Sequence, residues 1–273
     1  MVFNWLQDRR RRQRLSEPFP PAWDRIIERN VAHDAELDAD ERARLREFIQ
    51  IFIAEKSWEG CGGLEMTDEI RVTITAQAGL LVLGIPHEYY SNVRSILVYP
   101  TTVVTPKRAP GVFEMPTGPV ASGVPILGEA QLRGPVILVW DAVQRNARHP
   151  EQGHDVVYHE FAHKLDMLDG SVDGTPPLGN REEIRHWADV CEREFNDLRA
   201  RVARGKGTFL DQYGATNEAE FFAVATEFFF DKPSAMKRHE PELYELLRSF
   251  YGQDTAARAT RKGGPPPQQS AST

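Results

Sequence analysis

The segment from Tyr158 to Met167 constrains this chain more than any other, because it reads Y-H-E-F-A-H-K-L-D-M. It places His159, Glu160 and His163 in the spacing H-E-x-x-H, which is typical of zinc hydrolases. In a helix, positions i and i+4 lie on one face, so the two imidazoles can converge on a single ion. The glutamate can then reach a water at the open coordination position and act as a general base.

The residues around this motif favour a metal site over a chance match. A five-residue pattern can arise by accident, and an accidental one would more often lie on a solvated helix. Here the neighbours form an apolar surround, namely Val156, Val157, Tyr158, Phe161, Ala162, Leu165 and Met167. This pattern predicts a buried helix, in which histidine and glutamate side chains need partners.

The composition is that of a globular protein, with 273 residues, 41% hydrophobic and 27% charged. The formal charge of −7 argues against direct nucleic-acid binding through a broad basic surface. Two cysteines, Cys61 and Cys191, are too few for a disulfide framework or a Cys-rich zinc site and suit a reducing cytosol, so we expect a cytoplasmic protein. Purely apolar runs are short, which predicts no membrane span.

From its composition, we expect the chain to consist of an N-terminal arm, one domain and a C-terminal tail. Residues 1–21 contain an arginine cluster and then a proline-rich stretch, and are expected to be a flexible basic arm. Residues 22–252 are expected to form a single domain. Residues 253–273 are rich in Ala, Arg, Gly, Pro, Gln and Ser, and are expected to be a disordered tail.

Periodicity and capping signals predict an α+β fold, with a mainly helical chain and a small mixed β-sheet next to the motif helix. Strands are expected at 95–99 and 135–140, with a weaker one at 120–126, and loops at 58–63, 101–119 and 170–179. Helices are expected at residues 22–30, 38–55, 67–84, 141–148, from about 153 through the motif, 181–202, 217–230 and 242–251.

A catalytic zinc needs a third protein ligand, and the motif does not contain one. Asp169 lies where some zinc peptidases place it after a glycine-mediated chain reversal, but the position that needs glycine is Asp166. Asp166 is better suited to accept a hydrogen bond from a ligand imidazole. Asp169 is then left as a loop cap.

Stronger candidates lie downstream, where Glu218, Glu220 and Glu227 occur in an aromatic and apolar segment. Glu220 and Glu227 share a helix face, and acids are costly to bury there unless they are paired or bind a metal. Glu218 is more easily placed on the solvated side. Spacing alone leaves the choice among the three open.

Two segments together resemble a known family. H-E-F-A-H-K-L-D-M is followed by Y-x-A-T-x-x-A-E-x-F-A-V, which runs from Tyr213 to Val224. The combination resembles the Mlc titration factor A family, whose peptidase core is similar to the catalytic domain of anthrax lethal factor. The resemblance covers the chain from about Trp23 to Tyr251 and implies a zincin-like metallopeptidase domain.

The resemblance also implies a role for each site residue. The ligands of one Zn²⁺ per chain would be His159, His163 and Glu220, and the general base would be Glu160. Tyr213 would lie at the active site, where its hydroxyl could donate a hydrogen bond to a developing oxyanion. The roles of Asp166 and Glu227, supporting or structural, stay open.

The function implied is zinc-dependent hydrolysis of peptide bonds, with aminopeptidase-type activity on a peptide or protein substrate. An extended substrate could pair with the sheet edge at residues 136–140. The alternative is a binding protein that sequesters a transcriptional repressor of the Mlc type, with a structural zinc. A structural site alone is less favoured, because such sites usually have four protein ligands.

Overall fold

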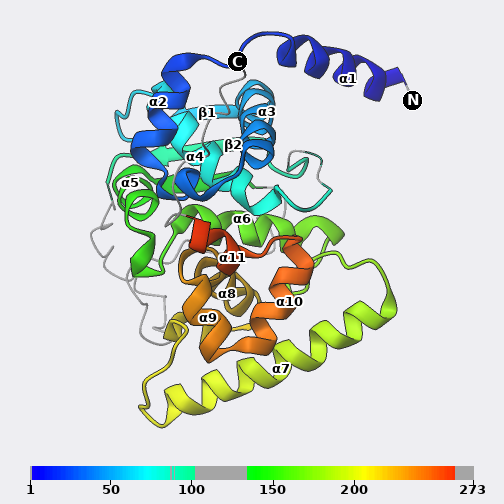
Figure 1. The fold of residues 1–273 in the computed structure, drawn as a ribbon, viewed down its shortest axis with the longest axis vertical. Helices are drawn as coiled ribbons and strands as arrows, with labels where there is room; N and C mark the ends of the chain where they lie inside the picture. Colours follow the sequence, from blue (N-terminus) through cyan, green and yellow to red (C-terminus); the bar gives the residue numbers. More distant parts are fainter. Residues whose placement is uncertain (1, 87, 89, 102–133, 262–273) are drawn as a thin grey trace, which may run out of the picture.

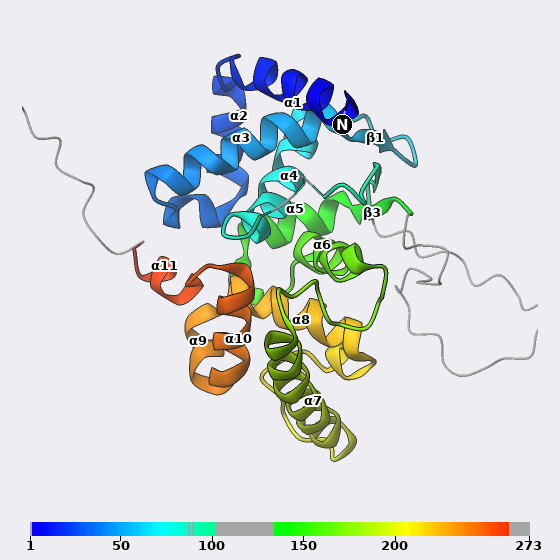
Figure 2. The same ribbon diagram turned by 90° about the vertical axis from the view of Figure 1, so that its right-hand side faces the viewer.

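The computed structural model describes residues 2–86, 88, 90–101 and 134–261. The motif helix, α6 (Val156–Asp166), runs through the middle of the molecule. Helices α2 to α5 and the sheet lie on one side of it, and helices α7 to α10 lie on the other (Figures 1 and 2). The expected α+β class is confirmed, with a mostly helical chain and a small sheet.

Five α-helices precede α6 in the described residues, namely α1 (Val2–Leu15), α2 (Pro21–Asn30), α3 (Ala39–Glu55), α4 (Asp68–Val82) and α5 (Trp140–Arg148). Helix α3 begins with a capping box between Asp38 and Glu41, and Thr67 caps α4. Helix α4 is buried along almost its whole length. Gly79 makes this possible, because a Cβ there would lie 2.7 Å from side-chain atoms of Leu45 and Phe48 on α3. The two helices therefore pack closely.

The sheet has three parallel strands in the order β1 (Ser57–Gly60), β2 (Ser95–Tyr99) and β3 (Val136–Val139). Side chains alternate between buried and half-buried in β2 and β3, as period-two strands require. Within the described residues all three strands run parallel, whereas a mixed sheet was expected. The expectation of a loop at 58–63 was wrong in part, because Ser57–Gly60 is strand β1. Pairing with β2 overrides the local glycine signal there. The predicted strand 120–126 and nearly all of loop 101–119 lie outside the described residues.

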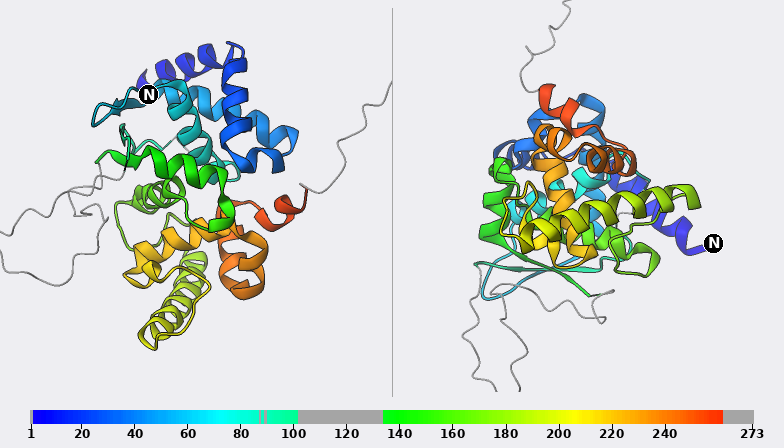
Figure 3. Two further views of the ribbon diagram at one scale, coloured as in Figure 1. Left: turned by 90° about the vertical axis from the view of Figure 1, so that its left-hand side faces the viewer. Right: turned by 90° about the horizontal axis from the view of Figure 1, so that it is seen from below.

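The second half contains α7 (Arg181–Ala203), α8 (Glu218–Asp231), α9 (Pro233–His239) and α10 (Pro241–Tyr251). Helix α8 is buried on nearly all sides and packs against α6, whereas α7 lies at the periphery with one buried face (Figures 1 and 3). Short 3-10 helices are η1 (Ala32–Glu36), η3 (Pro150–Gln152), η4 (Met167–Asp169) and η5 (Gln212–Ala215). The close packing of α6 and α8 creates the candidate site.

Two of the described helices lie in segments that composition assigned to the arm and the tail. The expected flexible arm contains helix α1 (Val2–Leu15), which packs on α3 through an ion pair of 2.6 Å between Arg11 and Glu55. The segment expected to be a tail begins with α11 (Thr255–Arg261). Its Arg258 is buried and bonds to Glu41 and Gln253. Ion pairs with residues distant in sequence therefore hold both helices against the domain.

The short apolar runs of the sequence predict no membrane span. In the part of the chain that the structure describes, every helix is too short or too polar to cross a bilayer.

Candidate metal centre

Helix α6 carries the motif and begins three residues later than expected, at Val156. The Asp155 carboxylate caps it by accepting hydrogen bonds from the backbone N–H groups of Val157 (2.8 Å) and Tyr158 (2.9 Å). The helix packs into the core through its apolar side chains. The side chain of His163 is buried, and that of His159 is 15% exposed. Both imidazoles are therefore largely shielded from solvent.

Helix α8 and the turn η5 supply the facing side of the site. The side chain of Asn217 caps α8 by accepting the N–H of Glu220 at 2.9 Å. The side chain of Asp211 caps η5 by accepting the N–H of Tyr213 at 2.7 Å. Since α8 packs against both α6 and η5, these caps fix where the Glu220 and Tyr213 side chains leave the backbone.

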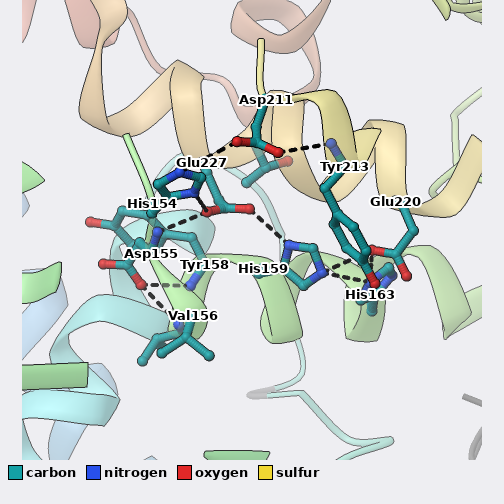
Figure 4. Close-up of polar contacts among 12 residues, drawn as sticks. His154, Asp155, Val156, Tyr158, His159, His163, Asp211, Tyr213, Glu220 and Glu227 are labelled. Atoms are coloured by element: carbon teal, nitrogen blue, oxygen red, sulfur yellow. Dashed lines mark hydrogen bonds and ion pairs between the residues drawn. The ribbon is translucent and has the colours of Figure 1, made fainter. Parts of the chain in front are cut away.

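Three atoms that can bind a metal converge between the two helices (Figure 4). The Nε2 atoms of His159 and His163 lie 3.2 Å apart. Oε2 of Glu220 lies 3.0 Å from the first and 3.4 Å from the second. Ligand atoms about 2.0–2.1 Å from a tetrahedral zinc are separated by about 3.3 Å. The spacing therefore fits a metal ion of this size.

The chemistry of the three residues fits a cation as well. Oε2 of Glu220 is buried and accepts no hydrogen bond of good geometry, which would be costly without a positive partner. Burial lowers the pKa of His159, but Glu220, Glu227 and Glu160 outweigh it and raise the pKa to about 10. Burial raises the pKa of Glu220, but the two imidazoles reverse this and lower it to about 2. The surroundings thus favour positive charge at this point.

Glu227 is placed behind the site rather than in it. Its Oε1 lies 2.8 Å from Nδ1 of His159, and its Oε2 accepts the backbone N–H of Asp155 at 2.8 Å. With Nδ1 held as the donor, Nε2 of His159 is left with its lone pair toward Glu220 and His163. Glu227, open as a ligand from spacing alone, therefore orients the His159 imidazole.

Among the two acids whose roles were open, Glu227 contacts a motif imidazole, whereas Asp166 hydrogen-bonds to the backbone. Oδ2 of Asp166 accepts the N–H of Gly174 at 3.0 Å, and its buried Oδ1 accepts no hydrogen bond. Asp166 therefore ties the loop after α6 to the helix. Asp169 accepts the N–H of Ser171 at 2.9 Å, as expected of a loop cap. Glu218 is exposed, as its solvated placement predicts.

Glu160 and Tyr213 lie half-buried beside the three converging atoms. Burial raises the pKa of Glu160, although the neighbouring imidazoles oppose the rise. Burial and the charge of Glu220 raise the pKa of Tyr213 to about 12, so its hydroxyl stays protonated and can donate. The Tyr213 ring centre lies 5.9 Å from that of His159. A base and a hydrogen-bond donor thus adjoin the candidate metal position.

The sequence did not lead us to two polar residues that cap the elements carrying the site, Asp155 and Asp211. Asp155 stands directly before the motif helix, where an aspartate is a recognisable N-cap signal. Asp211 stands two residues before Tyr213 and could have been found in the same way.

The sequence matches the model of the glucose-regulated metallo-peptidase M90 family over residues 5–252. An uncharacterized protein of Synechocystis is 36% identical over 251 residues, which cover 91% of this chain and 89% of the relative. Mlc titration factor A of Serratia proteamaculans is 31% identical over 229 residues, which cover 82% of this chain and 85% of the relative. Mlc titration factor A of Yersinia pestis is 27% identical over 252 residues, which cover 88% of this chain and 89% of the relative. The expected resemblance is confirmed. This chain belongs to the glucose-regulated metallopeptidase M90 family, and its domain is of the metallopeptidase type.

Proposed function

We propose that this protein is a zinc-dependent peptidase with His159, His163 and Glu220 as the metal ligands. The observation that carries the proposal is the convergence of these three ligand atoms beside the half-buried Glu160. Two imidazoles, one carboxylate and an open fourth position are typical of catalytic zinc. When bound, zinc supplies Lewis acidity, which lowers the pKa of water toward about 7 and polarises a carbonyl.

Glu160 is the proposed general base. Its carboxylate takes one proton from the water that attacks the peptide carbonyl carbon, and then delivers that proton to the amide nitrogen as the C–N bond breaks. The water oxygen remains on the new carboxyl product. A glutamate whose pKa is raised by burial is better suited to both steps than a solvated one, because its pKa lies closer to neutrality.

Tyr213 is the proposed hydrogen-bond donor to the oxyanion that develops on the carbonyl oxygen. Its hydroxyl lies near Glu220 and remains protonated at neutral pH, since its pKa is about 12. A donor aimed at developing charge stabilises the transition state more than the ground state. The cap by Asp211 holds the turn that presents this side chain.

For the substrate, we propose an aminopeptidase-type preference, which rests on the family resemblance. An extended peptide could lie along β3, which ends the three-stranded sheet in the described residues and packs against α6. Main-chain hydrogen bonds to such an edge bind a peptide with little dependence on its side chains. We also propose a cytoplasmic location, in line with the two free cysteines.

The test compares purified wild-type protein with Glu160→Gln, which keeps the shape of the side chain but not its basicity. We expect one zinc per chain in both by elemental analysis. Hydrolysis of a panel of amino-acid chromogenic amides should fall by about 10²–10⁴-fold in the variant, the usual contribution of a general base. Full activity in Glu160→Gln would rule out this mechanism.

A second proposed function is binding of a transcriptional repressor of the Mlc type, supported by the names of the Serratia and Yersinia relatives. The same variant separates the two functions. If binding is independent of hydrolysis, Glu160→Gln should bind a purified Mlc-type repressor with the wild-type Kd while its peptidase activity is lost. A Kd above the micromolar range for both proteins would count against the binding role.

A further inference from the structure

His154 lies just before the cap of the motif helix, with its side chain between two carboxylates (Figure 4). Its Nε2 is 3.5 Å from Oδ2 of Asp211, and its Nδ1 is 3.8 Å from Oε2 of Glu227. The His154 side chain is 57% exposed, whereas that of Glu227 is only 6% exposed. One surface histidine therefore faces both a buried acid and a partly exposed one.

Each of these acids already holds a part of the candidate site. Glu227 orients His159 through the 2.8 Å contact with Nδ1. Asp211 caps the turn that presents Tyr213 through the 2.7 Å bond to its N–H. The two acids come from different elements, the end of the loop before η5 and the middle of α8. His154 is in contact with both.

We propose that His154 is a positioning residue that ties the acid behind His159 to the acid that caps the Tyr213 turn. It holds the ligand imidazole and the hydrogen-bond donor in a fixed relation without touching a substrate or the metal. The effect on Tyr213 rests on the proposed peptidase function. The effect on His159 needs only that the site binds a metal, and so can be measured separately.

The expected size of the effect follows from exposure. Direct hydrogen-bond partners of metal-binding histidines contribute about 10–100-fold to metal affinity. His154 acts one step further away, and its contacts are screened by solvent. Lys232, whose charge opposes that of His154, also lies nearby. We therefore expect about three- to tenfold effects rather than loss of function.

His149 provides a matched control. It is an exposed histidine on the same segment, 54% exposed at its side chain, and its Nδ1 pairs with Glu151 at 3.2 Å. It contacts an acid, as His154 does, but that acid holds no part of the site. Any general effect of removing a surface histidine should therefore appear equally in His149→Ala.

The experiment measures zinc affinity by competition with a chromogenic chelator, and kcat at saturating zinc. We expect His154→Ala to weaken zinc binding and lower kcat by about three- to tenfold each, with KM little changed. His149→Ala should match the wild type. His154→Arg, whose guanidinium can donate to both carboxylates, should restore most of both quantities.

Double-mutant cycles test whether His154 acts through Glu227 and Tyr213. In a Glu227→Gln background, His154→Ala should weaken zinc binding no further, and in a Tyr213→Phe background it should lower kcat no further. Additive effects in both cycles, or equal effects of His154→Ala and His149→Ala, would overturn the proposal. If the wild type proves to have no peptidase activity, the proposed function fails, while the zinc-affinity cycle still decides the link between His154 and His159.

Discussion

Helix α8 pairs with half-buried histidines at two places, and only one of them is suited to bind a metal. Glu220 in its first turn and Glu227 in its middle contact His159. At its end, Asp231 lies 3.1 Å from Nε2 of His33, whose Nδ1 is 3.4 Å from Glu36. Both clusters place an imidazole between two carboxylates. The first also has His163, so that three ligand atoms converge within 4.8 Å.

The difference lies in where the imidazole protons go. At His33, both ring nitrogens face carboxylates, so a protonated imidazole can donate to both and form a structural ion pair. At His159, one nitrogen faces Glu227, while the other faces a second imidazole nitrogen and an oxygen with no hydrogen bond. A proton satisfies the first arrangement, whereas the second is suited to a metal ion.

The largest effect should come from Glu220→Gln, which keeps the volume of the side chain but removes the charged ligand. We expect loss of stoichiometric zinc binding and a fall in peptidase activity of about 10³-fold or more, because a catalytic zinc needs three protein ligands. Elemental analysis and amide hydrolysis would measure this. Asp231→Asn is the comparison at the other cluster, and should retain zinc. Stoichiometric zinc in Glu220→Gln would exclude it as a ligand.

Glu227→Gln should weaken zinc binding by about 10–100-fold without abolishing it, because His159 remains a ligand but is less well oriented. Chelator competition is the measurement. Glu218→Gln, at an exposed position on the same helix, serves as its control and should bind zinc as the wild type does. Equal affinities for the two variants would mean that Glu227 has no part in orienting His159.

The cluster of His33, Glu36 and Asp231 should instead make the stability of the fold depend on pH. Burial lowers the pKa of His33, but the hydrogen bonds and charges of Asp231 and Glu36 outweigh it and raise the pKa from 6.5 to about 9. The folded protein then holds a proton that the unfolded chain has released, so this contribution is present below pH 6.5 and is lost as the pH rises through about 9.

We expect this contribution to be about 1–2 kcal/mol, since the raised pKa of Asp231 offsets part of it. Urea unfolding of the wild type and His33→Gln at pH 7 and pH 9.5 tests this. The difference in unfolding free energy between the two proteins should shrink at the higher pH. A constant difference would show that His33 is neutral in the folded state throughout this range.

The smallest effect should come from Arg11→Ala, which removes the ion pair between α1 and α3. Partly exposed ion pairs contribute about 0–1 kcal/mol, so the global unfolding free energy should change by less than 1 kcal/mol. Zinc affinity should stay the same. Hydrogen exchange should show faster exchange within α1 alone. A change in zinc affinity would connect this peripheral helix to the site.

Much of the fold follows from local signals in the sequence. The capping residues Asp38, Thr67 and Asn217 mark where α3, α4 and α8 begin. Strand β1 and helices α1 and α11 could not be predicted in this way, because their residues have weak local preferences and depend on partners elsewhere. Arg258, for example, looks like part of a polar tail until Glu41 is placed beside it.

The candidate site likewise contains some residues marked by local sequence patterns and others that depend on contacts between distant segments. The spacing of His159, Glu160 and His163 is a local pattern, and the resemblance supplied Glu220 and Tyr213. The supporting contacts could not be derived, because Glu227 reaches Nδ1 of His159 only through the packing of α6 on α8. Local spacing therefore pointed to Asp166, one helical turn after His163, whose partner is instead the backbone of Gly174.

The separation of the three proposed ligands along the chain affects when the site can form during synthesis. Two of them lie on α6 and the third on α8, with the whole of α7 between them. A ribosome-bound chain that ends within α7 has only the motif histidines, which hold a metal weakly. High-affinity capture must wait until α8 has emerged and docked. Loading of the proposed metal would thereby be a late event, and a chain truncated before α8 lacks one of the three proposed ligands.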